Sequence, residues 1–131
     1  MISHVHLGVA DLDRAFAFYA PLMAELGLPL RFHDTEKGWA GWASPSGGRP
    51  LLLIGRPFDG AAPTPGNGTM LALSAESRSV VDRCHALALA LGGLDEGAPG
   101  LRPQYHARYY GGYFRDPDGN KLCVVCHATE G

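Results

Sequence analysis

The chain has few cysteines, almost balanced charge and no long apolar run, and each of these absences argues against a class of protein. Only 3 of its 131 residues are cysteine, so we expect reduced thiols rather than a disulfide framework. No apolar run approaches the roughly 20 residues that span a bilayer. The 11 Lys and Arg residues stand against 13 Asp and Glu residues, so neither nucleic acid nor an anionic membrane is an expected partner.

The start of the chain and its length indicate a cytoplasmic, single-domain protein. No basic segment followed by a long apolar core precedes the first predicted strand, so no signal peptide is expected and cytoplasmic localisation is predicted. A chain of 131 residues buries roughly two thirds of its unfolded surface, which is enough for a stable core.

The segment 4–19 predicts a strand that turns directly into a helix. Val5, Leu7 and Val9 alternate on one face of the strand, which leaves His4 and His6 on the other. Asp11 can then cap a helix by accepting a hydrogen bond from its first turn. Apolar residues recur at helical spacing up to Gly27, which ends the helix: Leu12, Ala15, Phe16, Tyr19, Leu22, Met23 and Leu26.

The rest of the chain predicts further strands and a second helix. The predicted strands are Pro29–His33, Trp39–Ala43, Leu51–Ile54 and Met70–Ser74. A segment rich in Gly and Pro, Arg56–Asn67, is predicted to link two halves. Ser77 can cap the second helix, which Gly92 and Gly93 stop. The aromatic and basic segment Leu101–Tyr110 is predicted to form the next hairpin strand and its approach.

Two alignments indicate that the second half repeats the first. Met70–Leu73 aligns with His4–Leu7, which brings Ser77 onto Asp11. Tyr113–Gly119 aligns with Gly41–Gly47, which matches the predicted turn of the second half with that of the first. A duplicated module explains both alignments, although Pro-Gly turns also recur in unrelated sheets for backbone reasons.

Two motifs resemble those of the vicinal oxygen chelate superfamily, which includes glyoxalase I, extradiol dioxygenases and bleomycin-resistance proteins. The first is the segment from His4 to Tyr19, and the second is the hairpin Asp116-Pro117-Asp118-Gly119-Asn120-Lys121-Leu122. The resemblance implies an α+β fold of paired βαβββ modules, whose sheets curl around a central cavity lined by His4 and Cys123, with the helices outside. The modules would span about 1–56 and 68–128 of a single domain, 1–131, with a linker at about 57–67. The resemblance also implies a homodimer.

The resemblance places four metal-ligand positions on this chain, and three of them carry unusual residues. The positions are His4, Leu51 or a near neighbour, Met70 and Cys123. Only His4 is the usual ligand, because Leu51 has no donor atom and a thioether is a poor ligand for a hard cation. We therefore expect no cofactor and no metal at the family position. If a divalent ion binds elsewhere, His4, His6 and Cys123 are the expected ligands.

The segment Cys123–His127 spells C-x-x-C-H, the attachment motif of c-type haem. On a predicted strand, Cys123 and Cys126 point to opposite faces, which favours neither haem attachment nor a redox pair. His6 itself has a second interpretation, as a hydrogen-bonded core side chain.

Two functions fit these observations. In the first, a glyoxalase-like or bleomycin-resistance-like protein binds a small anionic or aromatic molecule without the usual metal site. In the second, an enzyme of the lyase or dioxygenase type acts on a small oxygenated or thiol-conjugated substrate, through a non-standard metal site or metal-free acid-base chemistry. His4 and His6 are the candidate catalytic residues. The candidate ligand-binding residues are His4, His6, Tyr105, His106, Arg108, Tyr110 and Cys123.

Overall fold

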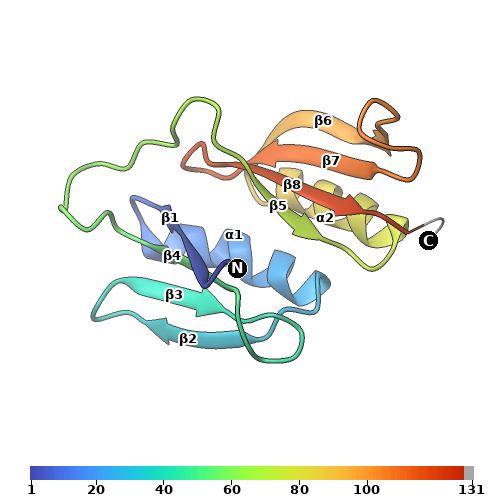
Figure 1. The fold of residues 1–131 in the computed structure, drawn as a ribbon. Coiled ribbons are helices and arrows are strands. Elements are labelled where there is room, and N and C mark those ends of the chain that lie inside the picture. Colours follow the sequence, from blue (N-terminus) through green and yellow to red (C-terminus); the bar gives the residue numbers. More distant parts are fainter. Residues whose placement is uncertain (129–131) are drawn as a thin grey trace.

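The computed structural model describes residues 1–128, which form two four-stranded sheets and two helices (Figure 1). In chain order the elements are β1 (His4–Gly8), α1 (Leu12–Glu25), β2 (Leu30–Asp34), β3 (Trp39–Trp42), β4 (Leu51–Gly55), β5 (Leu71–Ser74), α2 (Arg78–Ala90), β6 (Leu94–Leu101), β7 (Tyr110–Arg115) and β8 (Lys121–Cys126). The strand order is β1-β4-β3-β2 in the first sheet and β5-β8-β7-β6 in the second. Each half is a strand-helix-three-strand module, so the predicted α+β fold is confirmed. Within these residues, neither helix is both long enough and apolar enough to cross a membrane.

Both helices begin and end where the sequence predicted. The Asp11 carboxylate accepts a hydrogen bond from the Arg14 amide at 3.2 Å, and the Ser77 hydroxyl accepts one from the Val80 amide at 3.3 Å. These side chains satisfy amides that have no partner inside the helix. Gly27 follows α1 with a φ of 73°, a left-handed conformation that glycine adopts without steric cost.

Each sheet has one face against the helices and one face away from them. In Figure 1 both helices lie behind the sheets, and one apolar core joins α1 and α2 to both sheets. We call the opposite side of each sheet the front face. Trp42 contacts Phe16 of α1, whereas Trp39 contacts Phe32 on the front face, with ring centroids at 5.7 and 4.7 Å. The two tryptophans therefore point to opposite faces of the sheet.

A buried polar network fastens the last hairpin to the first module. The Tyr19 hydroxyl donates to the Asp116 carboxylate at 2.6 Å. The Asn120 side-chain amide donates both to Asp116 and to the Gly8 carbonyl, each at 2.9 Å. Asp116 and Asn120 are almost fully buried, and buried polar groups are stable only when they are paired in this way. The hairpin motif thus orders the joint between the two modules.

The modules repeat in space, but one of the sequence alignments was out of register. It matched Gly41 with Tyr113 and, further on, Leu51 with Cys123. In the structure Gly41 pairs with Leu53, and Tyr113 pairs with Cys123. The first module's turn is therefore two residues longer than its counterpart, and Leu53 occupies the position of Cys123. An ungapped alignment has no means of detecting this insertion.

The prediction of a strand over the aromatic segment was wrong. The strand is β6, Leu94–Leu101, and residues 102–109 form the loop that joins it to β7. β6 contains Gly97, Pro99 and Gly100, which lower the strand signal in the sequence. It is the edge strand of its sheet, with two irregularities in its pairing, and an edge tolerates proline and glycine that a central strand would not. We call residues 102–109 the aromatic loop.

Candidate functional site

The two histidines of β1 lie on the front face of the first sheet, as the alternation predicted. They are paired with Leu51 and Leu53 of β4. His4 is exposed, and its Nδ1 lies 2.9 Å from the hydroxyl of Ser3. It therefore has a local hydrogen-bond partner at the surface and faces solvent.

His6 lines a cavity of about 400 Å³ beneath the linker, together with residues that include Pro57, Asp59 and Thr64. Its imidazole makes no hydrogen bond within residues 1–128. Partial burial, and the nearby charge of His4 to a lesser extent, lower the pKa of His6 below its usual value of 6.5. His6 is thus a neutral imidazole with free hydrogen-bonding capacity at neutral pH.

On the front face of the second sheet, two tyrosines cover a buried thiol. Cys123 of β8 is fully buried. The Tyr109 hydroxyl lies 3.5 Å from the Cys123 sulfur. It also lies 2.9 Å from the hydroxyl of Tyr113, a residue of β7. Burial raises the pKa of Cys123 and of both tyrosines. All three groups are therefore protonated at neutral pH, and the thiol is not an activated nucleophile.

Two cationic side chains adjoin this cluster. The Arg102 guanidinium lies 5.4 Å, and the Lys121 ammonium 5.8 Å, from the centre of the Tyr113 ring. Both charges lower the pKa of Cys123, against the larger effect of its burial, so both lie near the thiol. Neither cation forms a salt bridge in the described part of the chain. The front of the second sheet therefore presents two positive charges, without a neutralising carboxylate, next to aromatic rings.

Three of the predicted ligand-binding residues lie in the aromatic loop, at the rim of this cluster. Tyr105 is 63 % exposed, with its ring 4.8 Å from that of Tyr109. His106 and Arg108 are exposed as well. His106 Nε2 lies 2.9 Å from Nδ1 of His127, which ties the loop to the residue that follows β8.

Tyr110, in contrast, lies on the helix side of its sheet. Its hydroxyl donates to the Asp82 carboxylate of α2 at 2.6 Å, and the Arg78 guanidinium lies 5.3 Å from its ring. The Asp82 contact raises the pKa of Tyr110. The structure therefore separates Tyr110 from Cys123, with which the sequence had grouped it.

Sequence reasoning did not select Arg102, Tyr109, Tyr113 or Lys121 as site residues. A usable signal existed for Lys121, because it lies two residues before Cys123 on the same strand and so shares its face. Tyr113 pairs directly with Cys123, but that pairing depends on the hairpin register. Arg102 and Tyr109 reach the cluster only through the path of the loop.

The residues at the family's metal position do not suit a metal. With the register corrected, Leu53 takes the place of Leu51, and the position that the resemblance implies comprises His4, Leu53, Met70 and Cys123. Leu53 lies in an apolar cluster with Leu51 and Phe32, and the Cys123 thiol already contacts Tyr109. Nowhere in residues 1–128 do three or more His, Cys, Asp or Glu side chains come together as a metal site, so His4, His6 and Cys123 do not converge.

The C-x-x-C-H segment has the geometry expected of a strand. Cys126 belongs to the apolar core under the helices, whereas Cys123 lies on the front face. The two thiols are free and buried on opposite sides of β8. They are therefore placed neither for attachment of one haem nor for a disulfide with each other.

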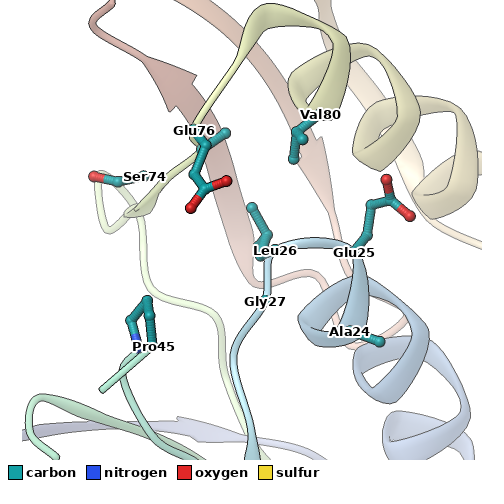
Figure 2. A pocket seen from close by; sticks show the side chains of 9 residues that line it. Ala24, Glu25, Leu26, Gly27, Pro45, Ser74, Glu76 and Val80 are labelled. Atoms are coloured by element: carbon teal, nitrogen blue, oxygen red, sulfur yellow. The ribbon is translucent and has the colours of Figure 1, made fainter. Parts of the chain in front are cut away.

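Two more cavities lie between the modules, away from the front-face clusters. One, of about 310 Å³, lies at the end of α1 (Figure 2), where the Glu25 and Glu76 side chains border it. Glu25 is already paired with Arg83. The other, also about 310 Å³, is an apolar seam between the β1 and β5 edges that includes Val5 and Leu71. Neither contains a cation or a tyrosine, unlike the second-sheet cluster.

Comparison with known proteins supports the resemblance seen in the sequence. A family model described as Glyoxalase/Bleomycin resistance protein/Dioxygenase superfamily matches residues 1–124. A crystal structure of a glyoxalase/bleomycin resistance protein from Albidiferax ferrireducens T118 is 38% identical, covers 96% of this chain and 98% of its own, and gives a TM-score of 0.85. A glyoxalase-related enzyme from Fulvimarina pelagi shares the fold at 20% identity, with 96% and 87% coverage and a TM-score of 0.72. No curated protein matches the chain.

Proposed function

Because the chain belongs to the glyoxalase/bleomycin resistance protein/dioxygenase superfamily but lacks the family's usual ligand set, we propose that it binds a small anionic aromatic molecule without a metal. The binding site is the front of the second sheet. One observation carries this proposal: Arg102 and Lys121 both lie against Tyr113, and neither has a carboxylate partner in residues 1–128.

The chemistry of this surface suits such a ligand. A guanidinium and an ammonium bind carboxylate or phosphate oxygens through charge-assisted hydrogen bonds. The rings of Tyr105 and Tyr109 offer apolar area next to these charges, and aromatic side chains bury a ligand ring favourably. A few convergent polar groups set among aromatic surfaces are typical of small-molecule sites. His106 and Arg108 at the rim are proposed to add contacts to the anion.

Calorimetric titration with benzoate and phenyl phosphate, and with neutral benzamide as the uncharged comparison, tests the proposal. We expect the anions to bind more tightly than benzamide. Arg102→Gln and Lys121→Gln should each weaken anion binding by about tenfold or more, because one charge-assisted hydrogen bond contributes about 1.5–3 kcal/mol. Arg31→Gln, an exposed arginine of the first sheet, is the matched control. If Arg102→Gln and Lys121→Gln bind the anions as tightly as Arg31→Gln does, the site lies elsewhere.

A second function, metal-free acid-base catalysis, is favoured by one separate observation. His6 is a neutral imidazole with a lowered pKa and no hydrogen-bond partner in the described chain, and it lines a cavity of about 400 Å³. A neutral imidazole within reach of a substrate proton is a competent general base. If a small oxygenated or thiol-conjugated substrate is turned over, His6→Gln should abolish turnover.

Homodimerisation stays a prediction as well. Sedimentation at micromolar concentration is the direct measurement, and a monomer there would contradict it.

A further inference from the structure

A continuous hollow runs between the two modules, at the end of the first sheet where β1 and β4 begin. Its centre is the apolar seam, a cavity of about 310 Å³ that includes Val5 and Leu71. A second cavity of about 500 Å³, which we call the mouth, includes Arg49. Because Ile2 and Pro50 line both cavities, the seam opens directly into the mouth.

The walls of the seam are apolar and come from both modules. Val5 of β1 and Leu71 and Leu73 of β5 are only partly buried, so part of their apolar surface borders the hollow. Trp42 and Leu52, which line the same cavity, belong to the core. Apolar surface gathered in one groove marks a binding site, whereas apolar residues scattered singly do not. The seam therefore suits a hydrocarbon chain, whose burial is favourable in proportion to its area.

The mouth adds a positive charge at one end of the seam. The Arg49 guanidinium donates to the Ser3 hydroxyl at 3.0 Å and to the Ser3 carbonyl at 3.4 Å, both through the same terminal nitrogen. A guanidinium carries five N–H donors, so its other nitrogens still have hydrogens to donate. Charge-assisted hydrogen bonds of this kind favour a carboxylate.

The opposite end of the hollow carries negative charge. Pro45 and Ser74 line both the seam and the cavity at the end of α1, which the Glu25 and Glu76 side chains border (Figure 2). Glu25 is ion-paired, whereas Glu76 forms no salt bridge within residues 1–128. Its carboxylate repels an anionic head group. An amphiphile with an anionic head therefore has one favourable direction, with the head in the mouth and the chain in the seam.

We propose that the hollow is a binding site for a linear alkyl carboxylate, with the hydrocarbon chain in the apolar seam and the carboxylate at Arg49. A volume of about 310 Å³ is at the lower end of the range for small-molecule sites, so the seam holds one short chain rather than a bulky molecule. This site uses other residues and other chemistry than the anion site proposed for the second sheet, and neither site depends on the other.

Calorimetric titration with butanoate, hexanoate and octanoate, and with 1-octanol as the uncharged comparison, tests the site. Each added methylene that enters the seam should tighten binding by up to about fourfold. Arg49→Gln should weaken octanoate binding by about tenfold or more. It should leave 1-octanol binding unchanged, because only the carboxylate meets the guanidinium. Arg31→Gln, an exposed arginine at the other edge of the first sheet, is the matched control.

The emission of Trp42 locates the bound chain. The protein has two tryptophans, and Trp42, but not Trp39, lines the seam. The variant Trp39→Phe therefore keeps one reporter there, and octanoate should change its emission with the same Kd as in calorimetry. Arg102→Gln should bind octanoate as wild type does, which separates this site from the second-sheet site. Failure of benzoate to bind is thus a separate result.

Three results would overturn the proposal. They are no binding of octanoate, equal affinity for the three carboxylates, and equal affinity of Arg49→Gln and Arg31→Gln for octanoate. A second copy of the chain that covers the seam would give the first of these results. In that case Ile2→Asp, at a residue that is 52 % exposed in the single chain, would also dissociate the dimer in sedimentation.

Discussion

Replacing Tyr19 with phenylalanine should show how much the buried joint between the modules contributes to stability. Tyr19 of α1 is fully buried, and its hydroxyl donates to the Asp116 carboxylate at 2.6 Å. Phenylalanine keeps the ring and removes only this bond. A hydrogen bond to a charged group contributes about 1.5–3 kcal/mol, a large part of the roughly 5–15 kcal/mol that stabilises a typical domain. Urea unfolding followed by circular dichroism measures the loss.

The same variant should also change the response to alkaline pH. Burial, together with the Asp116 carboxylate, raises the pKa of Tyr19 well above its usual value of 10.0. Because the folded-state pKa is the higher one, the unfolded chain loses this proton first. The contribution of Tyr19 is therefore fully present below about pH 10 and falls as the pH rises above it. Tyr19→Phe should lose less stability than wild type between pH 9 and pH 11.

Tyr110→Phe is the matched control for both measurements. Its hydroxyl makes a bond of the same length, 2.6 Å, to the Asp82 carboxylate, but at an exposed site. Water replaces such a contact, so we expect a loss below about 1 kcal/mol. The reasoning is refuted if Tyr19→Phe costs no more than Tyr110→Phe at pH 7.

Two further predictions concern packing and thiol chemistry. Gly93→Ala should destabilise the protein by about 1–3 kcal/mol in urea unfolding, because a Cβ there would lie 2.8 Å from the backbone oxygens of Ala88 and Arg115. Gly48→Ala is the control and should be nearly neutral, because a Cβ at Gly48 would have its nearest heavy atom 3.9 Å away. Burial raises the pKa of Cys84 to about 12. Iodoacetamide should therefore modify Cys84 at pH 9 only as fast as the protein unfolds. Rapid modification of the folded protein would contradict this prediction, because it would show that the thiol is accessible.

Local patterns in the sequence were enough to determine both helices and every strand except β6, together with the buried faces of the strands they identified. The caps at Asp11 and Ser77, the glycines after each helix and the alternation in β1 each depend on residues within one or two turns of the chain. The opposite orientations of Trp39 and Trp42, and of Cys123 and Cys126, follow from the same two-residue period. The family motifs determined the order of these elements. All of this could be read without coordinates, because each inference needed only neighbours in the sequence.

The site depended on information that only the tertiary structure holds. Tyr110 was a candidate binding residue and Tyr109 and Tyr113 were not, but the structure places Tyr110 on the helix side of β7 and brings Tyr109 and Tyr113 to Cys123. In a strand, a shift of one residue moves every side chain to the other face. The two extra residues in the first turn exchanged Leu51 for Leu53 at the metal position, a shift of two residues that keeps the same face of the strand. Arg102 reaches Tyr113 through a loop closed by His106 and His127, residues 21 positions apart, and no local period encodes a contact over that distance.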